Sequence, residues 1–347
     1  MRVLVMGAGA IGSLVGGRLA AAGNDVTLVG RPALVNAVNA RGLVIVDSHD
    51  NSCAHSVRAV SAVEEIQQGD AEFDLIVITV KVYDTLAAAT SLLPLAKRGT
   101  PVLVLQNGVG GDEIAKQVLE GSVLFSAIIT LVVSVLEPGR IRLTTTKGGV
   151  GLAPASSGQP LTALADLLRQ AGFSVRTYGD YRAMKWSKLL LNLLANASPA
   201  ILDMPPDEIF ADSRLSMLEV TAFREALSVM RGMGLSSVSL PDYPVPLFAW
   251  ALSTLPLVLL RPLFQRLVAG GRGGKMPSLH IDLSRGKGKS EVEYLNGAVV
   301  RAAQQLGMRV PANEALNTVL VGIVRGDIPW EDYRGRPDAL LRCANML

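Results

Sequence analysis

The N-terminal stretch carries the pattern that most restricts how this chain can fold. Residues 3–6 form a short apolar run, and the motif Gly7-x-Gly9-x-x-Gly12 follows it at once. Residues 10–22 then have helix-forming composition and end at Gly23. A buried strand, a glycine turn and a helix in this order form the fingerprint of a dinucleotide-binding unit. The expected phosphate-binding residues are Gly7, Ala8, Gly9, Ala10, Ile11 and Gly12.

Each glycine of this motif has an expected physical role. Gly7 permits a tight turn, Gly9 lets a pyrophosphate approach the backbone, and Gly12 lets the helix pack closely on the strand. The helix N-terminus then offers unpaired N–H groups and the positive end of its dipole to phosphate. Two alternatives stay open. One is a secretory signal, which Arg2 and the apolar run imitate but which the glycines and Arg18 interrupt; the other is a fold of this type that binds no nucleotide.

The end of the second expected strand, residues 25–29, bears on which dinucleotide would bind. Folds that prefer NAD usually place Asp or Glu near this point, where it holds the ribose 2′-hydroxyl. Here Gly30 and Arg31 follow the strand instead. A guanidinium suits a 2′-phosphate through charge-assisted hydrogen bonds. We therefore expect NADPH or NADP⁺ rather than NADH, against the alternative that Arg31 is a solvated surface residue.

Length and composition limit the class of protein. A chain of 347 residues can form two domains of ordinary size. A net charge of +3 and a pI near 8.9 predict no nucleic-acid partner. Two cysteines, Cys53 and Cys343, and three histidines are too few for a disulfide framework or a metal cluster. These observations predict a reduced, cytoplasmic protein without a metal site.

An apolar segment in the second half contributes to the high mean hydropathy of +0.35. Residues 243–260 contain no charged side chain, which meets the length criterion for a membrane span. Pro244, Pro246 and Pro256 lie within it, and proline interrupts helices. We therefore expect a buried or peripheral helix and no transmembrane span. The role of the whole segment 241–275 is left open.

The pattern along the chain changes near residues 178–180. Before this point, short apolar runs alternate with helical segments, which predicts a parallel sheet with helices on both faces. Strands are expected at 3–6, 25–29, 75–80, 102–105, 128–135, 139–146, 149–152 and 175–177. Beyond it, long helices are expected at 181–198, 207–233, 246–268 and 288–306, with a loop at the glycine-rich patch 270–275. The sequence thus predicts an α/β dinucleotide-binding domain, 1–178, followed by an all-α domain, 179–347.

Polar residues follow two of the expected strands in the first domain. Lys81 comes after the strand 75–80, and Asn107-Gly108 follows the strand 102–105. Ligands of open α/β sheets bind outside the carboxyl ends of the strands, so both positions are expected to face the cofactor. For Asn107-Gly108, a simple turn is the alternative to a role near the nicotinamide.

In the second domain, Lys188, Asn192 and Asn196 recur every four residues and would share one helix face. The residues between them are mainly Leu and Ala, so this helix is expected to be largely buried. Buried polar groups are costly unless satisfied, and lysine is rarely buried unpaired. The three residues are therefore candidates for a site, with hydrogen bonding between helices as the structural alternative.

Glu291 is a further candidate at the start of the expected helix 288–306. Ser290 could cap this helix in a capping box with Glu293, and Glu291 would then only complement the helix dipole. The sequence leaves this structural alternative and a catalytic role for Glu291 equally open.

Taken together, the motifs resemble those of the 2-dehydropantoate 2-reductase (ketopantoate reductase) family over nearly the whole chain. They are the glycine motif, Arg31, Lys81, Asn107-Gly108, Trp186-x-Lys188-x-x-x-Asn192-x-x-x-Asn196 and Glu291-x-x-Tyr294-x-Asn296-Gly297. The resemblance implies a Rossmann-type domain followed by a helical domain of the 6-phosphogluconate dehydrogenase C-terminal type. The implied reaction is NADPH-dependent reduction of ketopantoate to (R)-pantoate, in the pathway to pantothenate and coenzyme A.

The resemblance also implies roles for individual residues. Lys188 would be the general acid, Glu291 would hold the substrate hydroxyl and tune Lys188, and Asn107 would help position Lys188 and the nicotinamide. NADPH phosphate and ribose groups would be bound by Arg31 and Lys81. Substrate contacts would come from Asn192, Asn196 and Ser278. The spacing from Ser278 to Glu291 is about one residue longer than the family pattern.

Three functions are compatible with the sequence: a ketopantoate reductase, an NADPH-dependent reductase of another branched 2-oxo acid, and a non-catalytic, membrane-peripheral NADPH-binding protein. Intact Lys188, Asn192 and Glu291 argue against the third. A ketone must touch the nicotinamide and the acid at once, so we expect Asn107, Lys188 and Glu291 to line one interdomain cleft. The oligomeric state is left open, with a homodimer as one option.

Overall fold

The computed structural model of this chain describes residues 1–66, 72–97, 99–145, 147–156, 158–260, 276–286 and 288–346. These residues form two compact units. The first contains Met1–Lys185 together with Ser239–Tyr243, and the second contains Trp186–Val238 and Pro244–Leu347. The expected loop at 270–275 lies outside the described residues, and so do residues 261–268 of the helix expected at 246–268.

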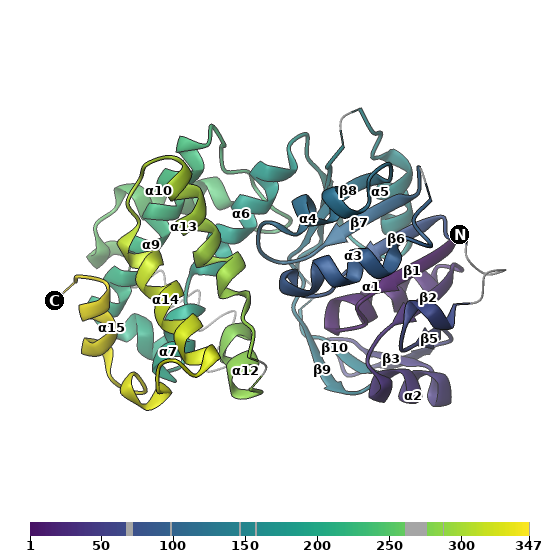
Figure 1. Cartoon of the computed structure of the whole chain (residues 1–347), viewed down its shortest axis with the longest axis horizontal. Helices are drawn as coiled ribbons and strands as arrows, with labels where there is room; N and C mark the ends of the chain where they lie inside the picture. The colour runs from purple at the N-terminus through teal and green to yellow at the C-terminus, as the bar shows by residue number, and fades with distance from the viewer. Residues whose placement is uncertain are drawn as a thin grey trace. The chain divides into compact units, whose positions relative to one another are not determined.

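The first unit is built on an eight-stranded sheet with the order β12-β11-β8-β7-β6-β1-β2-β5 (Figure 1). The six strands from β5 to β8 are parallel, whereas β11 pairs antiparallel to β8. The strands are β1 (Arg2–Met6), β2 (Asp25–Val29), β5 (Arg58–Val60), β6 (Leu75–Ile78), β7 (Pro101–Leu105), β8 (Val123–Ile129), β11 (Val150–Pro154) and β12 (Val175–Thr177). This confirms the predicted α/β class of the N-terminal half.

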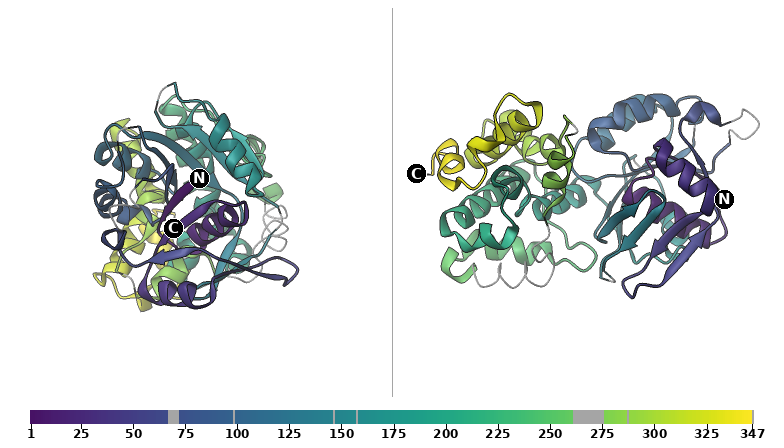
Figure 2. Two further views of the ribbon diagram at one scale, coloured as in Figure 1. Left: turned by 90° about the vertical axis from the view of Figure 1, so that its right-hand side faces the viewer. Right: turned by 90° about the horizontal axis from the view of Figure 1, so that it is seen from below.

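Helices cover both faces of this sheet because alternate residues of each strand point to opposite sides (Figures 1 and 2). On one face, Val3 and Val5 of β1 belong to a core with α1 and α5. On the other face, Leu4 belongs to a second core with α3 and α4. The helices of the unit are α1 (Ala10–Ala21), α2 (Pro32–Arg41), α3 (Thr85–Leu92), α4 (Gly111–Val118) and α5 (Thr162–Gln170), with the short helices η1 (Val63–Glu65) and η3 (Val82–Asp84).

A second, four-stranded sheet in this unit corrects two sequence expectations. Its order is β4-β3-β10-β9, with β3 (Leu43–Val46), β4 (Ser52–His55), β9 (Val133–Glu137) and β10 (Arg140–Leu143). The strand expected at 128–135 is wrong, since β8 ends at Ile129 in the large sheet and β9 begins at Val133 in the small one. The sequence analysis also missed β3 and β4. Strand β4 is largely exposed and has no apolar run, whereas β3 is a short apolar run with the sequence LVIV.

The second unit is helical, as predicted (Figure 1). Helix α14 packs against α7, α9, α13 and α15, and α12 packs against α7. Its helices are α7 (Ala197–Leu202), α8 (Pro206–Ala211), α9 (Ser213–Gly232), α10 (Val245–Thr254), α12 (Ser278–Ser284), α13 (Asn296–Gln305), α14 (Pro311–Arg325) and α15 (Pro337–Cys343), with η4 (Glu291–Tyr294) and η5 (Trp330–Asp332). Helix α6 (Tyr181–Leu193) begins in the first unit and continues into the second.

The long helices expected from the sequence are interrupted. The segment 181–198 breaks at Ala195, whose φ of 47° is left-handed, so Asn196 is the N-cap residue of α7. Asn196 therefore does not lie on the same helix as Lys188 and Asn192, contrary to the expected one-face arrangement. The segment 207–233 breaks at Asp212, whose carboxylate accepts from the backbone N–H groups of Arg214 and Leu215 and caps α9.

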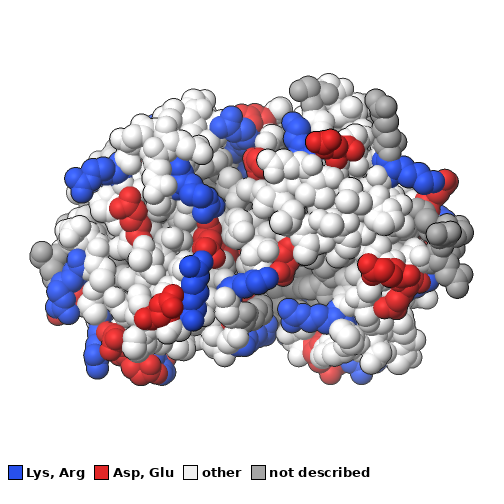
Figure 3. All heavy atoms as spheres, in the orientation of Figure 1, with Lys and Arg blue, Asp and Glu red and all other residues white. Residues whose placement is uncertain are grey.

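The apolar segment 243–260 contains the helix α10, part of whose surface is exposed. Leu247 and Trp250 are 58% and 56% exposed, while Ala249 and Leu252 are buried. Among the described residues, we find no helix with the length and hydropathy of a membrane span. On the face drawn in Figure 3, positive and negative side chains are intermingled over each unit.

Candidate active site

The glycine loop after β1 has the geometry that the sequence predicts. Gly7 has a φ of 107°, and a Cβ added to it would lie 2.7 Å from the backbone nitrogen of Val80. A Cβ on Gly12 would lie 2.3 Å from the carbonyl oxygen of Gly7 and 2.5 Å from Oγ1 of Thr79. Gly9, by contrast, is exposed and an added Cβ would meet nothing within 4 Å. Two glycines thus serve close packing, and the third leaves the backbone open to a ligand.

This loop follows β1, the strand at which the strand order of the sheet reverses direction. β1 pairs with β2 on one side and with β6 on the other. The N–H groups of Gly7 and Ala8 donate to the carbonyl oxygen of Val29, at 3.0 and 2.9 Å. The Thr79 hydroxyl, just beyond β6, donates to the carbonyl oxygen of Gly7 at 2.7 Å. Open α/β sheets bind their ligands at this switch point, outside the carboxyl ends of the strands.

The residues of the loop fit a dinucleotide's pyrophosphate. Gly9 is the N-cap residue of α1 and contributes no capping side chain, and the first turn of α1 contains no acidic residue. The N–H groups and positive dipole end of that turn are therefore directed at the open space beside Gly9.

Arg31 stands two residues beyond Val29, the strand residue that holds the glycine loop. It is exposed and is the N-cap residue of α2, and its neighbour Gly30 lies close enough to Ala8 that an added Cβ would be 3.0 Å from the Ala8 Cβ. The guanidinium therefore follows the strand end at which a carboxylate would hold the ribose of NAD. Lys81 is partly buried, follows β6 and is the N-cap residue of η3.

Asn107 is exposed just beyond β7, and the residue before it, Gln106, is held by hydrogen bonds. The side-chain amide of Gln106 donates to the carbonyl oxygen of Val80 at 2.7 Å and to Oγ1 of Thr85 at 2.8 Å. Gly108 and Gly110 have φ values of 85° and 112°, which only glycine adopts readily. The chain bends at residues 107–110, at the carboxyl edge of the sheet beside the end of β6.

In the second unit, the expected amide side chains take different roles. Asn192 is partly buried on α6, as is Lys188 one turn earlier. Asn196 is buried, and its Nδ2 donates to the carbonyl oxygen of Asn192 at 3.0 Å. Its Oδ1 accepts from the backbone N–H of Leu279 at 3.3 Å. Asn196 thus connects α6 with the first turn of α12, where Ser278 lies exposed.

Glu291 is 5% exposed and begins η4. The preceding Ser290 does act as the N-cap, since its hydroxyl accepts from the N–H of Val292 at 3.2 Å. Glu293 pairs with Arg325 at 3.0 Å instead of completing a capping box. The expected helix cap is therefore confirmed for Ser290, whereas the expected capping box with Glu293 is wrong. This leaves a buried carboxylate, Glu291, at the start of the helical turn.

The sequence reasoning missed Glu219, a carboxylate on α9 that is 2% exposed. It accepts from the backbone N–H of Ala195 at 2.7 Å and from the hydroxyl of Ser198. It therefore holds the break between α6 and α7 that carries Asn196. Its apolar helical neighbours give no signal of this role, because the partners come from another helix.

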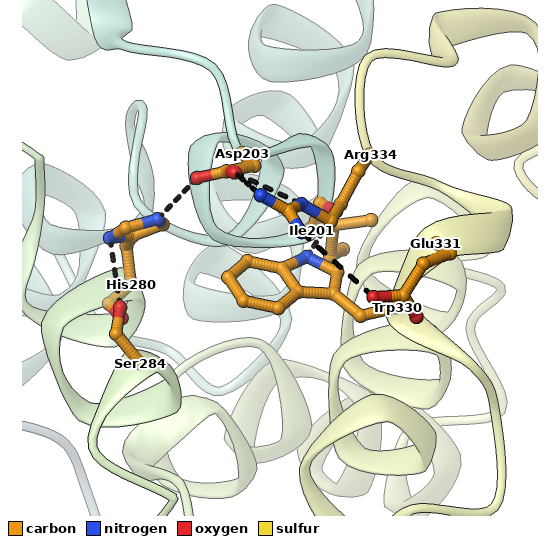
Figure 4. A network of polar contacts seen from close by, with 7 residues as sticks. All are labelled: Ile201, Asp203, His280, Ser284, Trp330, Glu331 and Arg334. Atoms are coloured by element: carbon orange, nitrogen blue, oxygen red, sulfur yellow. Dashed lines mark hydrogen bonds and ion pairs between the residues drawn. The ribbon is translucent and has the colours of Figure 1, made fainter.

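A second missed network fixes α12 (Figure 4). Asp203, at the end of α7, accepts from Nε2 of His280 at 2.6 Å and from Nη2 of Arg334 at 2.7 Å. The Arg334 guanidinium also lies 4.9 Å from the ring centroid of Trp330, whose indole N–H donates to the carbonyl oxygen of Ile201 at 2.9 Å. Partial burial acts to raise the pKa of Asp203, but the hydrogen bonds from His280 and Arg334 outweigh it and lower that pKa.

The structure thus gathers the predicted residues into two sets. In the first unit, the glycine loop, Arg31, Lys81 and Asn107 follow the carboxyl ends of parallel strands. In the second unit, Asn192, Asn196 and the first turn of α12 with Ser278 are connected, and Lys188 and Glu291 belong to the same unit. The roles predicted for these residues, and the boundary predicted at 178–180, stay predictions.

An α/β domain with a dinucleotide-type glycine loop, followed by a helical domain with a lysine, amides and a buried carboxylate, indicates a two-domain oxidoreductase. The chain belongs to the ketopantoate reductase PanE/ApbA family: its profile matches residues 3–156, and the profile of the family's C-terminal part matches residues 180–323. It is accordingly an oxidoreductase that acts on a CH–OH/C=O group. Loop, sheet order and family together support a nicotinamide dinucleotide as the cofactor.

Several relatives match over nearly their full length. The chain is 31% identical to a 2-dehydropantoate 2-reductase of Pyrococcus abyssi, covering 94% of this chain and 97% of that one. A PanE/ApbA family ketopantoate reductase structure from Ralstonia eutropha JMP134 has a TM-score of 0.78 at 31% identity, covering 94% of this chain and 99% of that one. A D-mandelate dehydrogenase with NADH and anilino(oxo)acetate has a TM-score of 0.79, covering 94% and 99%, but at 22% identity it shows the shared fold alone.

Proposed function

We propose that this protein reduces ketopantoate to (R)-pantoate with NADPH, and so serves the route to pantothenate and coenzyme A. The observation that carries the proposal is the position of Arg31 at the end of β2 in a chain that matches this family over both halves. A family match over both halves supplies the reaction class, and Arg31 stands where a NAD-preferring fold places a carboxylate. Relatives named 2-dehydropantoate 2-reductase support the substrate. In the cell we expect the enzyme in the cytoplasm.

We infer that Lys188 is the general acid of this reaction. Bound NADPH would supply a hydride to the ketone carbon, and negative charge would then develop on the ketone oxygen. The Lys188 ammonium would donate its proton to that oxygen, and a cation within hydrogen-bond reach would also lower the barrier. Glu291 would accept from a substrate hydroxyl and influence Lys188.

The remaining residues would bind and orient the two ligands. The backbone N–H groups beside Gly9 would hold the pyrophosphate, with Arg31 and Lys81 on phosphate and ribose groups. Asn192, Asn196 and Ser278 would hydrogen-bond the substrate, which suits a small acid carrying a carboxylate and a hydroxyl. Asn107 belongs to the first unit and Lys188 to the second, so the proposed reaction requires groups from both units.

Identification of the product tests this proposal directly. The purified protein would be incubated with ketopantoate and a limiting amount of NADPH, and the products separated on a chiral column. We expect (R)-pantoate in an amount equal to the NADPH consumed. The absence of pantoate, or formation of the (S) isomer, would contradict the proposal.

A further inference from the structure

A buried ion pair lies directly beneath the loop that carries Asn107. The side chains of Lys185 and Asp112 are each 3% exposed, and Nζ of Lys185 lies 3.2 Å from Oδ2 of Asp112. The same Nζ donates to the carbonyl oxygen of Gln106 at 3.0 Å. Lys185 comes from α6 and Asp112 from the first turn of α4, and all of these residues belong to the first unit.

The Gln106 carbonyl belongs to the peptide bond that precedes Asn107. A cation bonded to this oxygen therefore fixes the orientation of the peptide plane from which Asn107 projects. The Gln106 side chain is held by hydrogen bonds to Val80 and Thr85, and the Lys185 bond adds a constraint on the backbone carbonyl of the same residue. Asp112 in turn holds the lysine in place.

The ion pair is poorly explained as a device for stability. Two charges taken out of water pay a large desolvation cost, and apolar residues of similar size often stabilise such a site equally well. Moreover, Oδ1 of Asp112 is buried without a hydrogen-bond partner among the described residues. An ion pair that is kept despite this desolvation cost indicates that its two side chains serve to hold a neighbouring group in position.

We propose that Lys185 and Asp112 are positioning residues that act through the Gln106–Asn107 peptide to set the Asn107 side chain for the nicotinamide. The proposal rests on the function proposed above, since it assumes a role for Asn107 in that reaction. Because the Lys185 ammonium is occupied by Asp112 and the Gln106 carbonyl oxygen, we assign it this positioning part and not that of a proton donor.

The test replaces the pair as a whole, since removing one partner would leave the other charge buried and unpaired. The variant is Lys185→Met with Asp112→Leu. The matched control is Arg169→Gln with Asp166→Asn, which removes the exposed pair on α5 at 2.8 Å. Both variants would be compared by thermal unfolding, by hydrogen exchange of peptides covering residues 105–111, by fluorescence titration with NADPH, and by steady-state kinetics with ketopantoate.

We expect the buried-pair variant to fold with a midpoint near that of the wild type but to exchange the 105–111 amides about 10–100-fold faster, since a hydrogen bond to a charged group is lost. Its kcat should fall about 10-fold or more with little change in the KM for ketopantoate. In an Asn107→Ala background, the same replacement should lower kcat no further, because both changes act through one group. The control should match the wild type in every readout.

Unchanged exchange and unchanged kcat in the buried-pair variant would overturn the inference. So would a loss of kcat that adds fully to that of Asn107→Ala, because this is the behaviour of a purely structural pair. A wild-type protein without ketopantoate turnover would instead refute the proposed function. The exchange and NADPH titration would then still decide whether the pair sets the loop.

Discussion

In the proposed function, the preference for NADPH rests on Arg31. It is exposed, follows β2 directly, and stands where a carboxylate would select NAD. We predict that NADPH binds more tightly than NADH and that Arg31→Ala removes most of the difference, because the 2′-phosphate loses its charge-assisted bonds. Isothermal titration of both cofactors measures this. Equal affinities in the wild type would contradict the assignment.

Lys188 is the residue that the proposed chemistry needs most. We predict that Lys188→Ala lowers kcat about 10²–10⁴-fold, since the forming alkoxide loses its proton donor. The affinity for NADPH should stay close to that of the wild type, because the residues proposed to bind the cofactor lie in the other unit. Stopped-flow turnover together with fluorescence titration separates the two effects. Near-normal turnover would move the acid role to another group.

At this scale, the sequence predicts residues with a distinctive local context and misses those defined by distant partners. The glycine motif and Asn107-Gly108 follow short apolar runs, so their place at the sheet edge can be predicted from the pattern alone. Lys185 and Glu219 look like ordinary helix residues in the sequence. Their importance depends on burial against Asp112 and Ala195, which are remote along the chain.

The turn from β1 into α1 shows how one element combines structural and binding demands. We predict that Gly12→Ala destabilises the protein by about 1–3 kcal/mol, since its Cβ would clash with the Gly7 carbonyl. Gly9→Ala meets open space at a φ of −80°, so its stability should match the wild type while its affinity for NADPH falls. Urea unfolding and NADPH titration of both variants test the distinction. Equal destabilisation of the two would contradict the loop geometry.

The end of α7 gives a prediction on pH. The pKa of Asp203 is lowered in the folded protein by His280 and Arg334, so its stabilising effect is present above the unfolded pKa of about 3.9 and is lost as the pH falls through the folded pKa. Asp203→Asn should therefore weaken the fall in stability on acidification below about pH 4. Thermal unfolding measured from about pH 2 to about pH 7 tests this acid dependence, with Asp166→Asn as an exposed control. A variant with the full wild-type acid dependence would exclude this role for Asp203.

Element boundaries explain most of the errors made from the sequence. The periodicity of residues 181–198 is continuous, so it predicts one helix, but Ala195 adopts a left-handed conformation that Glu219 holds from α9. Likewise, residues 128–135 read as one apolar strand although β8 and β9 belong to different sheets. In both cases tertiary contacts override a local pattern.

For the molecule as a whole, the order of elements along the chain predicts the fold class of each half. Alternating strands and helices followed by helices alone predict the α/β and all-α halves, and the structure confirms both classes. The segment Ser239–Tyr243 belongs to the first unit although it lies within the helical half of the chain. Its contacts include the Thr130 hydroxyl donating to the Pro241 carbonyl at 3.1 Å, and no local pattern signals them.

The central claim is that this family member is an NADPH-dependent ketopantoate reductase. The most direct test is kcat/KM for NADPH oxidation with a panel of 2-oxo acids: ketopantoate, pyruvate, 2-oxoisovalerate and phenylglyoxylate. We predict the highest kcat/KM for ketopantoate, and a loss of about 10²-fold or more in Lys188→Ala. A higher kcat/KM for another member of the panel, or no oxidation with any of them, would contradict it.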